Sequence, residues 1–351
     1  MTFRVILLCA AILLSNPLSA RQKTDVIIMK NGDRITCEIK ALTSNTLYIS
    51  VSYILGTLSV DWDRVDHLES NQLFLVKTQD GRVYTGALST PGTPGERPLQ
   101  IEVVEAPENK VSLERSQVVN VRETAATFWQ RLNGQIGTGL TYSKGNQSTQ
   151  YNLNSDINYP AERWYAGASY GSNFVANTGS SNSTRNEVTL TAQRLLRWNN
   201  WYYAGLADFL QSSVQGIQIA NTFGGGIGRY LRNTGRTTFK VYGGFAWQRI
   251  SYQQAAVPSP TQHVTAALFG VSLNLFRFDR TTLTVNTIVL PALSQPGRVH
   301  FNLNSSYYVK LWGKLNWDFT VYGNWDNRPP PGFVGSDYGT ISGLSLSFGS
   351  R

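Results

Sequence analysis

The chain has few cysteines and histidines, and it lacks long apolar runs. Of its two cysteines, Cys9 falls in a predicted leader, which leaves Cys37 alone and excludes an internal disulfide. Its three histidines show no Cys/His spacing of a metal site. Beyond the N-terminus, no stretch reaches the roughly 18 apolar residues of a membrane helix. Charged residues make up 15% and aromatic residues 12% of the chain, a balance that favours an all-β membrane protein over a cytosolic enzyme.

The first twenty residues have the pattern of a secretory signal peptide. Arg4 supplies the positive start, residues 5–14 are apolar, and Ala20 ends a small-residue cleavage site. The apolar run is too short for a membrane anchor, and Leu8 stands where lipid attachment at Cys9 requires a small residue. The sequence therefore predicts export with a signal peptide at 1–20.

Charge is divided unevenly along the chain. Residues 21–125 carry a net charge of −2, and residues 126–351 a net charge of +10. An exported protein rarely meets nucleic acid, so we expect no nucleic-acid partner. Anionic lipid headgroups or a lumen that attracts anions fit a basic C-terminal half better.

Residues 21–125 contain a duplicated pattern. Residues 29–39 and 77–87 each read as a strand, a tight turn on Asn31-Gly32 or Asp80-Gly81, and an Arg-led second strand. Residues 56–65 and 109–118 also match one another. The pattern predicts two small SH3-like β units, 21–72 and 73–125. Such units dock other proteins or act as spacers, and in the docking role the expected partner is a periplasmic protein or peptidoglycan.

Residues 126–351 repeat runs of about ten residues in which apolar and polar side chains alternate. Residues 315–326 are typical, with Leu, Trp, Phe and Val on one face and Asn, Asp and Thr on the other. The repeats predict a transmembrane barrel of twelve antiparallel strands. The predicted strands are 135–143, 149–159, 164–174, 186–195, 201–211, 220–231, 237–250, 263–276, 281–290, 298–310, 314–325 and 338–348.

The connections between these strands indicate the topology. Links after the even-numbered strands are short, whereas those after the odd-numbered strands are mostly longer, as in outer-membrane barrels with periplasmic turns and extracellular loops. Both ends of the barrel would then face the periplasm. The alternative is a large soluble all-β protein, which would bury its aromatic faces against a second sheet.

Two sets of side chains are candidates for function. The first set faces the predicted lumen, where its members either line a passage or pair with one another; it comprises Asp156, Glu187, Asp208, Lys240, His300, Lys310 and Asp318. The second set is basic and follows the short turns, where tryptophans also gather. Its members either bind headgroup phosphates or are solvated turn charges: Arg163, Arg197, Arg232, Arg236, Arg277 and Arg280.

Catalytic patterns are sparse. A barrel phospholipase needs a histidine with a serine on the same strand face, but Asn302 stands two residues after His300. The remaining enzyme hypothesis is an outer-membrane hydrolase that uses His263 or His300. The glycines at 224–226 lie inside a predicted strand, where a phosphate loop is not expected. We expect no cofactor and no catalytic activity.

The barrel resembles a known family through the segments at its two ends. These segments are Gly-Thr-Gly-Leu-Thr-Tyr-Ser-Lys-Gly-Asn at 137–146 and Asp-Tyr-Gly-Thr-Ile-Ser-Gly-Leu-Ser-Leu-Ser-Phe at 337–348. Both are similar to the salt-induced outer membrane protein family (domain of unknown function 481). The resemblance implies a barrel, outer-membrane lipid and the barrel assembly machinery as partners, and no catalytic residues. One departure is that Gly349-Ser350-Arg351 follow the final aromatic residue, Phe348.

These observations predict an outer-membrane β-barrel protein with a periplasmic docking domain. It would act as a structural or interaction protein or as a narrow pore. A secreted soluble all-β binding protein and the hydrolase are the alternatives.

Overall fold

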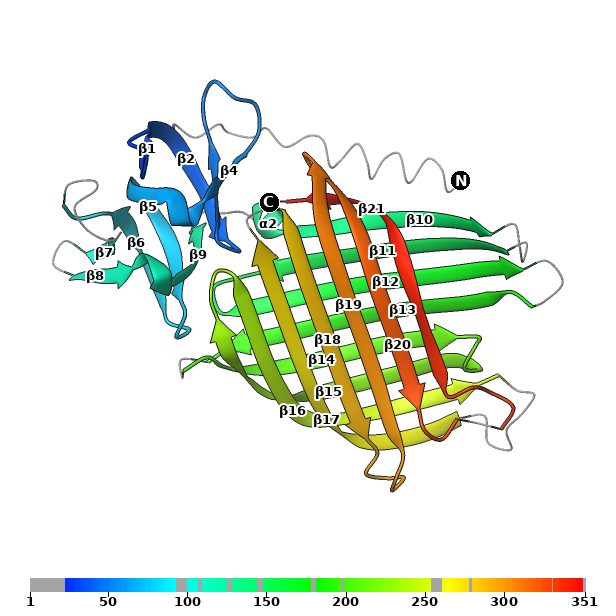
Figure 1. Cartoon of the computed structure of the whole chain (residues 1–351). Coiled ribbons are helices and arrows are strands. Elements are labelled where there is room, and N and C mark those ends of the chain that lie inside the picture. Colours follow the sequence, from blue (N-terminus) through cyan, green and yellow to red (C-terminus); the bar gives the residue numbers. More distant parts are fainter. Residues whose placement is uncertain are drawn as a thin grey trace.

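The structure, a computed structural model, describes residues 23–92, 100–106, 109–124, 128–143, 148–177, 181–196, 199–253, 261–277, 280–329 and 331–349. The predicted signal peptide and Arg197 lie outside these residues. Within them the chain forms an N-terminal sheet and a closed barrel (Figure 1). No helix in this part of the chain has both the length and the hydrophobicity to span a membrane.

The N-terminal sheet contains nine strands among the described residues. They are β1 (Asp25–Met29), β2 (Arg34–Thr43), β3 (Thr46–Ser50), β4 (Leu58–Asp61), β5 (Val65–Thr78), β6 (Val83–Ser89), β7 (Gln100–Ala106), β8 (Asn109–Glu114) and β9 (Val118–Glu123). Short 3-10 turns precede β5 and β9, at Trp62–Arg64 and Arg115–Gln117. The order of elements therefore repeats in the two halves of the sheet.

Strand β5 belongs to both halves of this repeat. Its first part pairs with β1, for example Glu69 with Val26, and its second part pairs with β9, for example Phe74 with Glu123. The register shifts between Ser70 and Phe74, where the predicted boundary between the two β units also falls. Because β2 pairs with β9 as well, the halves join in one sheet.

One hydrophobic cluster holds the N-terminal sheet together. It draws buried side chains from both halves, including Ile27, Leu42, Trp62, Phe74 and Val103. Since one core serves the whole region, the halves depend on each other for stability. Cys37 is also buried in this cluster, and burial raises the pKa of its thiol to about 12.

The barrel is closed by twelve antiparallel strands, as the sequence predicted. They are β10 (Asn133–Ser143), β11 (Ser148–Pro160), β12 (Trp164–Asn177), β13 (Ser183–Leu195), β14 (Trp201–Ser212), β15 (Ile217–Asn233), β16 (Thr237–Tyr252), β17 (Thr261–Arg277), β18 (Thr281–Pro291), β19 (Val299–Trp312), β20 (Leu315–Asp326) and β21 (Ser336–Phe348). Closure comes from β10 and β21, which pair between Gly134 and Phe348 and onward to Thr138 and Leu344.

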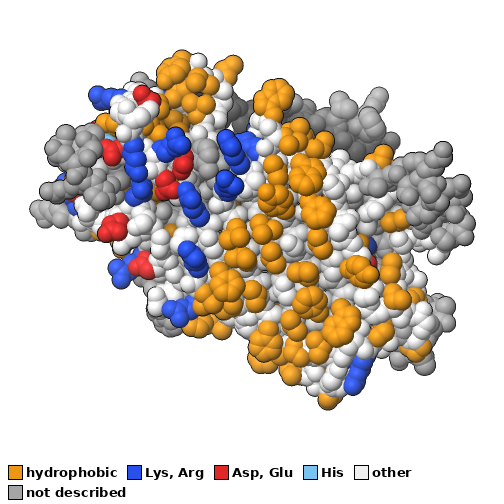
Figure 2. Space-filling model, in the orientation of Figure 1, with side chains coloured by type: hydrophobic (Ala, Val, Ile, Leu, Met, Phe, Trp, Pro, Cys, Tyr) orange, Lys and Arg blue, Asp and Glu red, His pale blue; other side chains and the backbone are white. Residues whose placement is uncertain are grey.

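The outer wall of the barrel is apolar because alternate side chains point outward. On β11, Tyr151 is 52% exposed and Leu153 is 42% exposed, whereas Asn152 between them is 5% exposed. Figure 2 shows hydrophobic side chains gathered over this wall, with Lys and Arg side chains between them and the N-terminal sheet. This distribution is typical of a barrel with lipid outside and polar groups inside.

The interior is less uniformly polar than the sequence predicted. On β16 to β18, Ala246, Ala266, Leu268 and Leu290 form a buried inward cluster. Tyr242 packs against it and lies close to Gly270, where an added Cβ would meet the ring 1.9 Å away. Apolar groups are stable here because they pack together inside the wall and are shielded from water. The lumen thus has one partly apolar side.

The N-terminal sheet lies at the end of the barrel that carries the short turns (Figure 1). The short helix α2 (Phe128–Arg131) leads from β9 to β10, and both the start of β10 and the end of β21 are at this end. The sheet is therefore placed over the mouth of the barrel on the side predicted to be periplasmic.

The shared core makes a prediction for neighbouring residues of β5. Phe74 is 0% exposed, and Leu73 beside it is 55% exposed. We expect Phe74→Ala to destabilise the N-terminal sheet by about 3–5 kcal/mol, and Leu73→Ala to change its stability by no more than about 0.5 kcal/mol. Pulse proteolysis of the N-terminal sheet in increasing urea measures both, and equal effects of the two variants would contradict a single buried core.

Candidate functional site

The barrel encloses a cavity of about 690 Å³. Of the side chains predicted to line the lumen, five line this cavity: Asp156, Glu187, Asp208, Lys240 and His300. Asp318 is almost fully buried beside it, where its Oδ2 accepts a hydrogen bond from Asn154 Nδ2 at 3.3 Å. Lys310 lies near the short-turn end of β19, opposite Asn316, and does not line the cavity. The lumen is therefore narrow and lined by charged, polar and apolar groups.

A polar bridge crosses the lumen near the long loops. Arg185 Nη2 lies 2.8 Å from Glu187 Oε2, and Arg185 Nη1 lies 3.0 Å from Asp337 Oδ2. Asn302 Nδ2 donates a hydrogen bond to Glu187 Oε1 at 3.3 Å. Glu187 is on β13 and Asn302 is on β19, six strands apart in a ring of twelve. The bridge therefore joins opposite walls and constricts the outer part of the lumen.

A second cluster fixes the rim beside this bridge. Arg298 Nη2 lies 2.6 Å from Asp326 Oδ2 and donates a hydrogen bond to the Tyr252 hydroxyl at 2.9 Å. His300 Nε2 lies 3.1 Å from the same Asp326 oxygen. Arg298 is buried, so these contacts tie β16, β19 and β20 together. Arg298 opened the predicted strand 298–310, two residues before His300 and therefore on the same face, but it was not among the residues predicted to line the lumen.

Sequence alternation marks Arg185 as a lumen residue, although it was not among the residues predicted to line the lumen. Arg185 stands two residues before Glu187 on β13, so both side chains point to the same face. The partnership with Asp337 on β21 has no such local signal, because it joins residues 152 positions apart.

Near the short-turn end, the lumen contains a cation held by aromatic rings. Lys240 Nζ lies 5.9 Å from the ring centroids of both Tyr202 and Tyr230, which is within cation–π range. Gln193 Nε2 donates a hydrogen bond to the Tyr230 hydroxyl at 2.6 Å. Farther along the wall, two residues from Glu187 in the pairing of β13 with β14, Asp208 accepts a hydrogen bond from Thr189 at 2.7 Å. These contacts order the side chains of this part of the wall.

The histidines do not form one catalytic site. His263 is exposed on the outer wall, where it stacks on Trp247 with ring centroids 5.7 Å apart. His300 lines the inner cavity and is bound to Asp326. His67 is in the N-terminal sheet, 3.0 Å from Glu69. Among the residues described by the structure, no group of three or more His, Cys, Asp or Glu side chains has the arrangement of a metal site.

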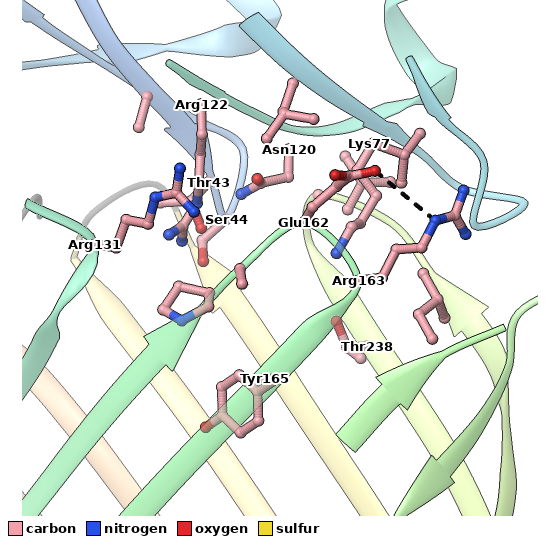
Figure 3. Close-up of a pocket in the computed structure, with 18 of the residues that line it drawn as sticks. Thr43, Ser44, Lys77, Asn120, Arg122, Arg131, Glu162, Arg163, Tyr165 and Thr238 are labelled. Carbon is pink, nitrogen blue, oxygen red and sulfur yellow. Dashed lines mark ion pairs between the residues drawn. The ribbon is translucent and has the colours of Figure 1, made fainter. Parts of the chain in front are cut away.

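A second cavity, of about 540 Å³, lies between the N-terminal sheet and the short turns of the barrel (Figure 3). Five cationic side chains and two acidic ones line it: Lys40, Lys77, Arg122, Arg131 and Arg163, with Glu123 and Glu162. Lys40 lies 2.6 Å from Glu38 Oε1, so part of this positive charge is compensated. The excess of cations makes this mouth of the barrel a place where anions are attracted.

Lys77 and Arg163 are the cations most enclosed by this cavity. Burial, together with the nearby charges of Arg122 and Arg163, lowers the pKa of Lys77 to about 8, against the opposing effect of Glu162. Arg163 Nη1 is buried and has no hydrogen-bond partner among the described residues. Its Nε lies 3.9 Å from Glu162 Oε1 (Figure 3), a distance too long for a strong pair. Both cations thus retain capacity for an anion.

The N-terminal sheet is attached to the barrel by turn-to-turn contacts. Asn200 Nδ2 donates a hydrogen bond to the Gln79 carbonyl at 2.6 Å, and Arg236 pairs with Asp63. Gly81, with φ +82°, lets the turns approach, because a Cβ there would lie 2.8 Å from Asn200 Oδ1. The predicted Asp80-Gly81 turn therefore also forms part of the contact between the sheet and the barrel. The sequence predicted the turn but not this contact.

The basic residues predicted at the short turns have different surroundings. Arg163 lines the cavity under the N-terminal sheet. Arg236 pairs with Asp63 of the N-terminal region. Arg232, Arg277 and Arg280 are exposed at the same end of the barrel, and Arg197 lies outside the described residues. Contact with the N-terminal sheet was not anticipated for this set.

The lumen cavity and the mouth cavity adjoin one another. They share lining residues near the short-turn ends of the strands, namely Tyr165, Gln193, Tyr230, Thr238 and Phe276. A solute in the lumen therefore meets the N-terminal sheet and its cationic cavity at one end, and the Arg185 bridge at the other.

Comparison with known proteins gives a family for the barrel. A family model described as "Protein of unknown function, DUF481" matches residues 136–348, and no curated protein matches the chain. The translocator domain of autotransporter NalP from Neisseria meningitidis is 13% identical, with TM-score 0.36, over 61% of this chain and 87% of that one. The NanC porin is 11% identical, with TM-score 0.37, over 61% of this chain and 98% of that one. These two likenesses are too low to support an argument about function.

The Arg185 bridge makes a prediction about stability. Arg185→Gln leaves the carboxylates of Glu187 and Asp337 without their cation inside the wall, so we expect a loss of about 3–5 kcal/mol. Heat or urea unfolding in detergent, followed by the gel mobility of the folded barrel, measures the loss. The triple variant with Glu187→Gln and Asp337→Asn should recover most of it; no recovery would show that the charges are not coupled.

Proposed function

This chain belongs to the DUF481 family, and we propose that it is an outer-membrane protein that acts as a narrow pore, constricted at its outer end by the Arg185 bridge. The bridge is the observation that carries the proposal, because it connects opposite walls of a closed barrel. No catalytic step is part of this function.

The outer wall supports a location in the membrane. Large apolar side chains such as Phe245 and Phe269 are well exposed on it, while their neighbours in sequence face the interior. A monomeric soluble protein rarely exposes so continuous an apolar band. The short turns and the N-terminal sheet share one end, which we assign to the periplasm because periplasmic turns are short in such barrels.

The lumen supports a restricted passage. Its cavity of about 690 Å³ adjoins the periplasmic mouth, so solutes have room on that side of the bridge. At the outer end, passage requires Glu187 and Asn302 to move apart or a solute small enough to pass beside them. Rings of charged side chains at such constrictions select by size and charge.

The N-terminal sheet supports a second role as a docking domain. It contacts the barrel through hydrogen bonds and ion pairs such as Asn200 with Gln79, and it leaves large hydrophobic side chains exposed, among them Tyr53, Leu55 and Leu73. In this role it would hold another periplasmic protein or peptidoglycan near the mouth. The barrel assembly machinery and outer-membrane lipid are the remaining proposed partners.

The hydrolase alternative receives less support from the geometry. His263 is on the outer face of the wall and His300 is on the inner face, so they cannot act together on one substrate. The carboxylate beside His300 is that of Asp326, which also pairs with Arg298.

Location is tested by fractionation. We expect the full-length protein to sediment with outer-membrane vesicles and to require detergent for extraction, because its apolar wall needs an acyl-chain environment. Release into the soluble fraction by salt alone would contradict a membrane-spanning barrel and favour the soluble alternative.

Conduction is tested in planar bilayers. We expect small single-channel steps from the purified protein and a conductance about twofold larger or more when Arg185→Ala and Asn302→Ala remove the constriction. Phe245→Ala, on the outer wall, is the control and should leave the conductance unchanged. If neither the wild type nor the double variant gives current steps, the pore proposal is wrong and the docking role remains.

A further inference from the structure

The mouth cavity between the N-terminal sheet and the barrel has features of a ligand site that the pore does not require. It is enclosed by two separate parts of the chain, β5 with β9 above and the turn between β11 and β12 below (Figure 3). Its cations come from both parts, so the site exists only where the sheet is docked.

The charges in the cavity point to an oxyanion. Lys77 comes from β5 of the N-terminal sheet and Arg163 from the turn of the barrel below it, and the ion pair of Arg163 with Glu162 among the described residues is 3.9 Å long. A buried guanidinium nitrogen without a partner is costly, and an anion that accepts its hydrogen bond removes that cost. The planar guanidinium and the ammonium together suit phosphate, which offers several acceptor oxygens.

The rest of the lining indicates that the phosphate is attached to a larger body. The cavity volume of about 540 Å³ exceeds the needs of a bare phosphate ion. Trp129 and Trp164 supply aromatic surface, while Thr43, Ser44 and Asn120 supply hydroxyl and amide groups. Apolar surface beside a few placed polar groups is the usual composition of a small-molecule site.

We propose that the mouth cavity binds a phosphate ester, with Lys77 and Arg163 holding the phosphate group and the tryptophan side of the cavity holding its organic part. The ester can come from two sources that share this chemistry. One is a soluble phosphorylated metabolite in the periplasm, and the other is the headgroup of a glycerophospholipid in the adjoining leaflet. The site does not depend on conduction through the lumen.

Glycerol 3-phosphate is the soluble probe. Calorimetric titration into the full-length protein in detergent should give saturable binding, weakened about tenfold or more by Lys77→Met with Arg163→Met. The matched control is Arg280→Met with Lys314→Met, which removes the same charge at the same end of the barrel from residues that do not line the cavity. The control should bind as the wild type does.

Phosphatidic acid is the lipid probe, because it carries the same glycerol phosphate group. Native mass spectrometry of the protein with phosphatidic acid, compared with phosphatidylcholine, should show retained lipid in the wild type and the control but not in the cavity variant. Binding of glycerol 3-phosphate that is lost in the cavity variant identifies a soluble ligand. Loss of phosphatidic acid alone identifies a headgroup.

A pH series gives a readout that a structural role for Lys77 would not give. Because the pKa of Lys77 is lowered to about 8, its ammonium is charged at pH 7 and largely neutral at pH 9. Affinity for the bound probe should therefore fall across this interval in the wild type. Lys77→Arg, which stays charged, should bind at both pH values with little change.

The proposal is overturned if neither probe binds the wild type, or if the cavity variant and the control bind equally well. It is also overturned if Lys77→Arg shows the same pH dependence as the wild type. Gel mobility of the folded barrel verifies that each variant is intact, and Lys77→Arg keeps the test decisive if the double variant does not fold. Neither binding measurement depends on conduction through the lumen. A negative result here therefore contradicts the phosphate site and leaves the pore proposal unaffected.

Discussion

A strand that crosses lipid has to hydrogen-bond along both edges, because no water is present to satisfy its backbone groups. The pairing of β10 with β21 meets this requirement by closing the ring. Closure then forces each strand to divide its side chains between acyl chains and interior. Tyr151 and Asn152 show the division at neighbouring positions, and the lumen, the rim and the mouth all follow from it.

Inside the ring, the distance between opposite walls determines which side chains can meet across the lumen. Twelve strands leave an interior small enough for Arg185 and Asn302 to contribute to one network from opposite walls. Apolar packing around Leu268 narrows the remaining space from one side. The N-terminal sheet then covers the mouth through contacts such as Arg236 with Asp63. Constriction at one end and a cationic cavity at the other are consequences of the same small circumference.

The sequence predicted the barrel well because alternation is a local property. All twelve strands begin and end within three residues of their predicted positions, since lipid penalises a polar side chain on the wrong face. The contacts that shape the site are not local. Arg185 meets Asp337 across 152 positions, and Arg236 meets Asp63 across 173, so neither follows from periodicity. Inward apolar residues such as Leu268 were also missed, because alternation alone does not show that both faces are apolar.

Lipid contact along one strand tests the account most directly. Single cysteines at Tyr151, Asn152, Leu153 and Asn154, introduced with Cys9→Ser, can carry a fluorophore, while Cys37 stays unreactive because burial raises its thiol pKa to about 12. In bilayers with brominated acyl chains, labels at 151 and 153 should be quenched and labels at 152 and 154 should not. Equal quenching at all four positions, or the reverse order, would contradict a barrel whose apolar faces meet lipid.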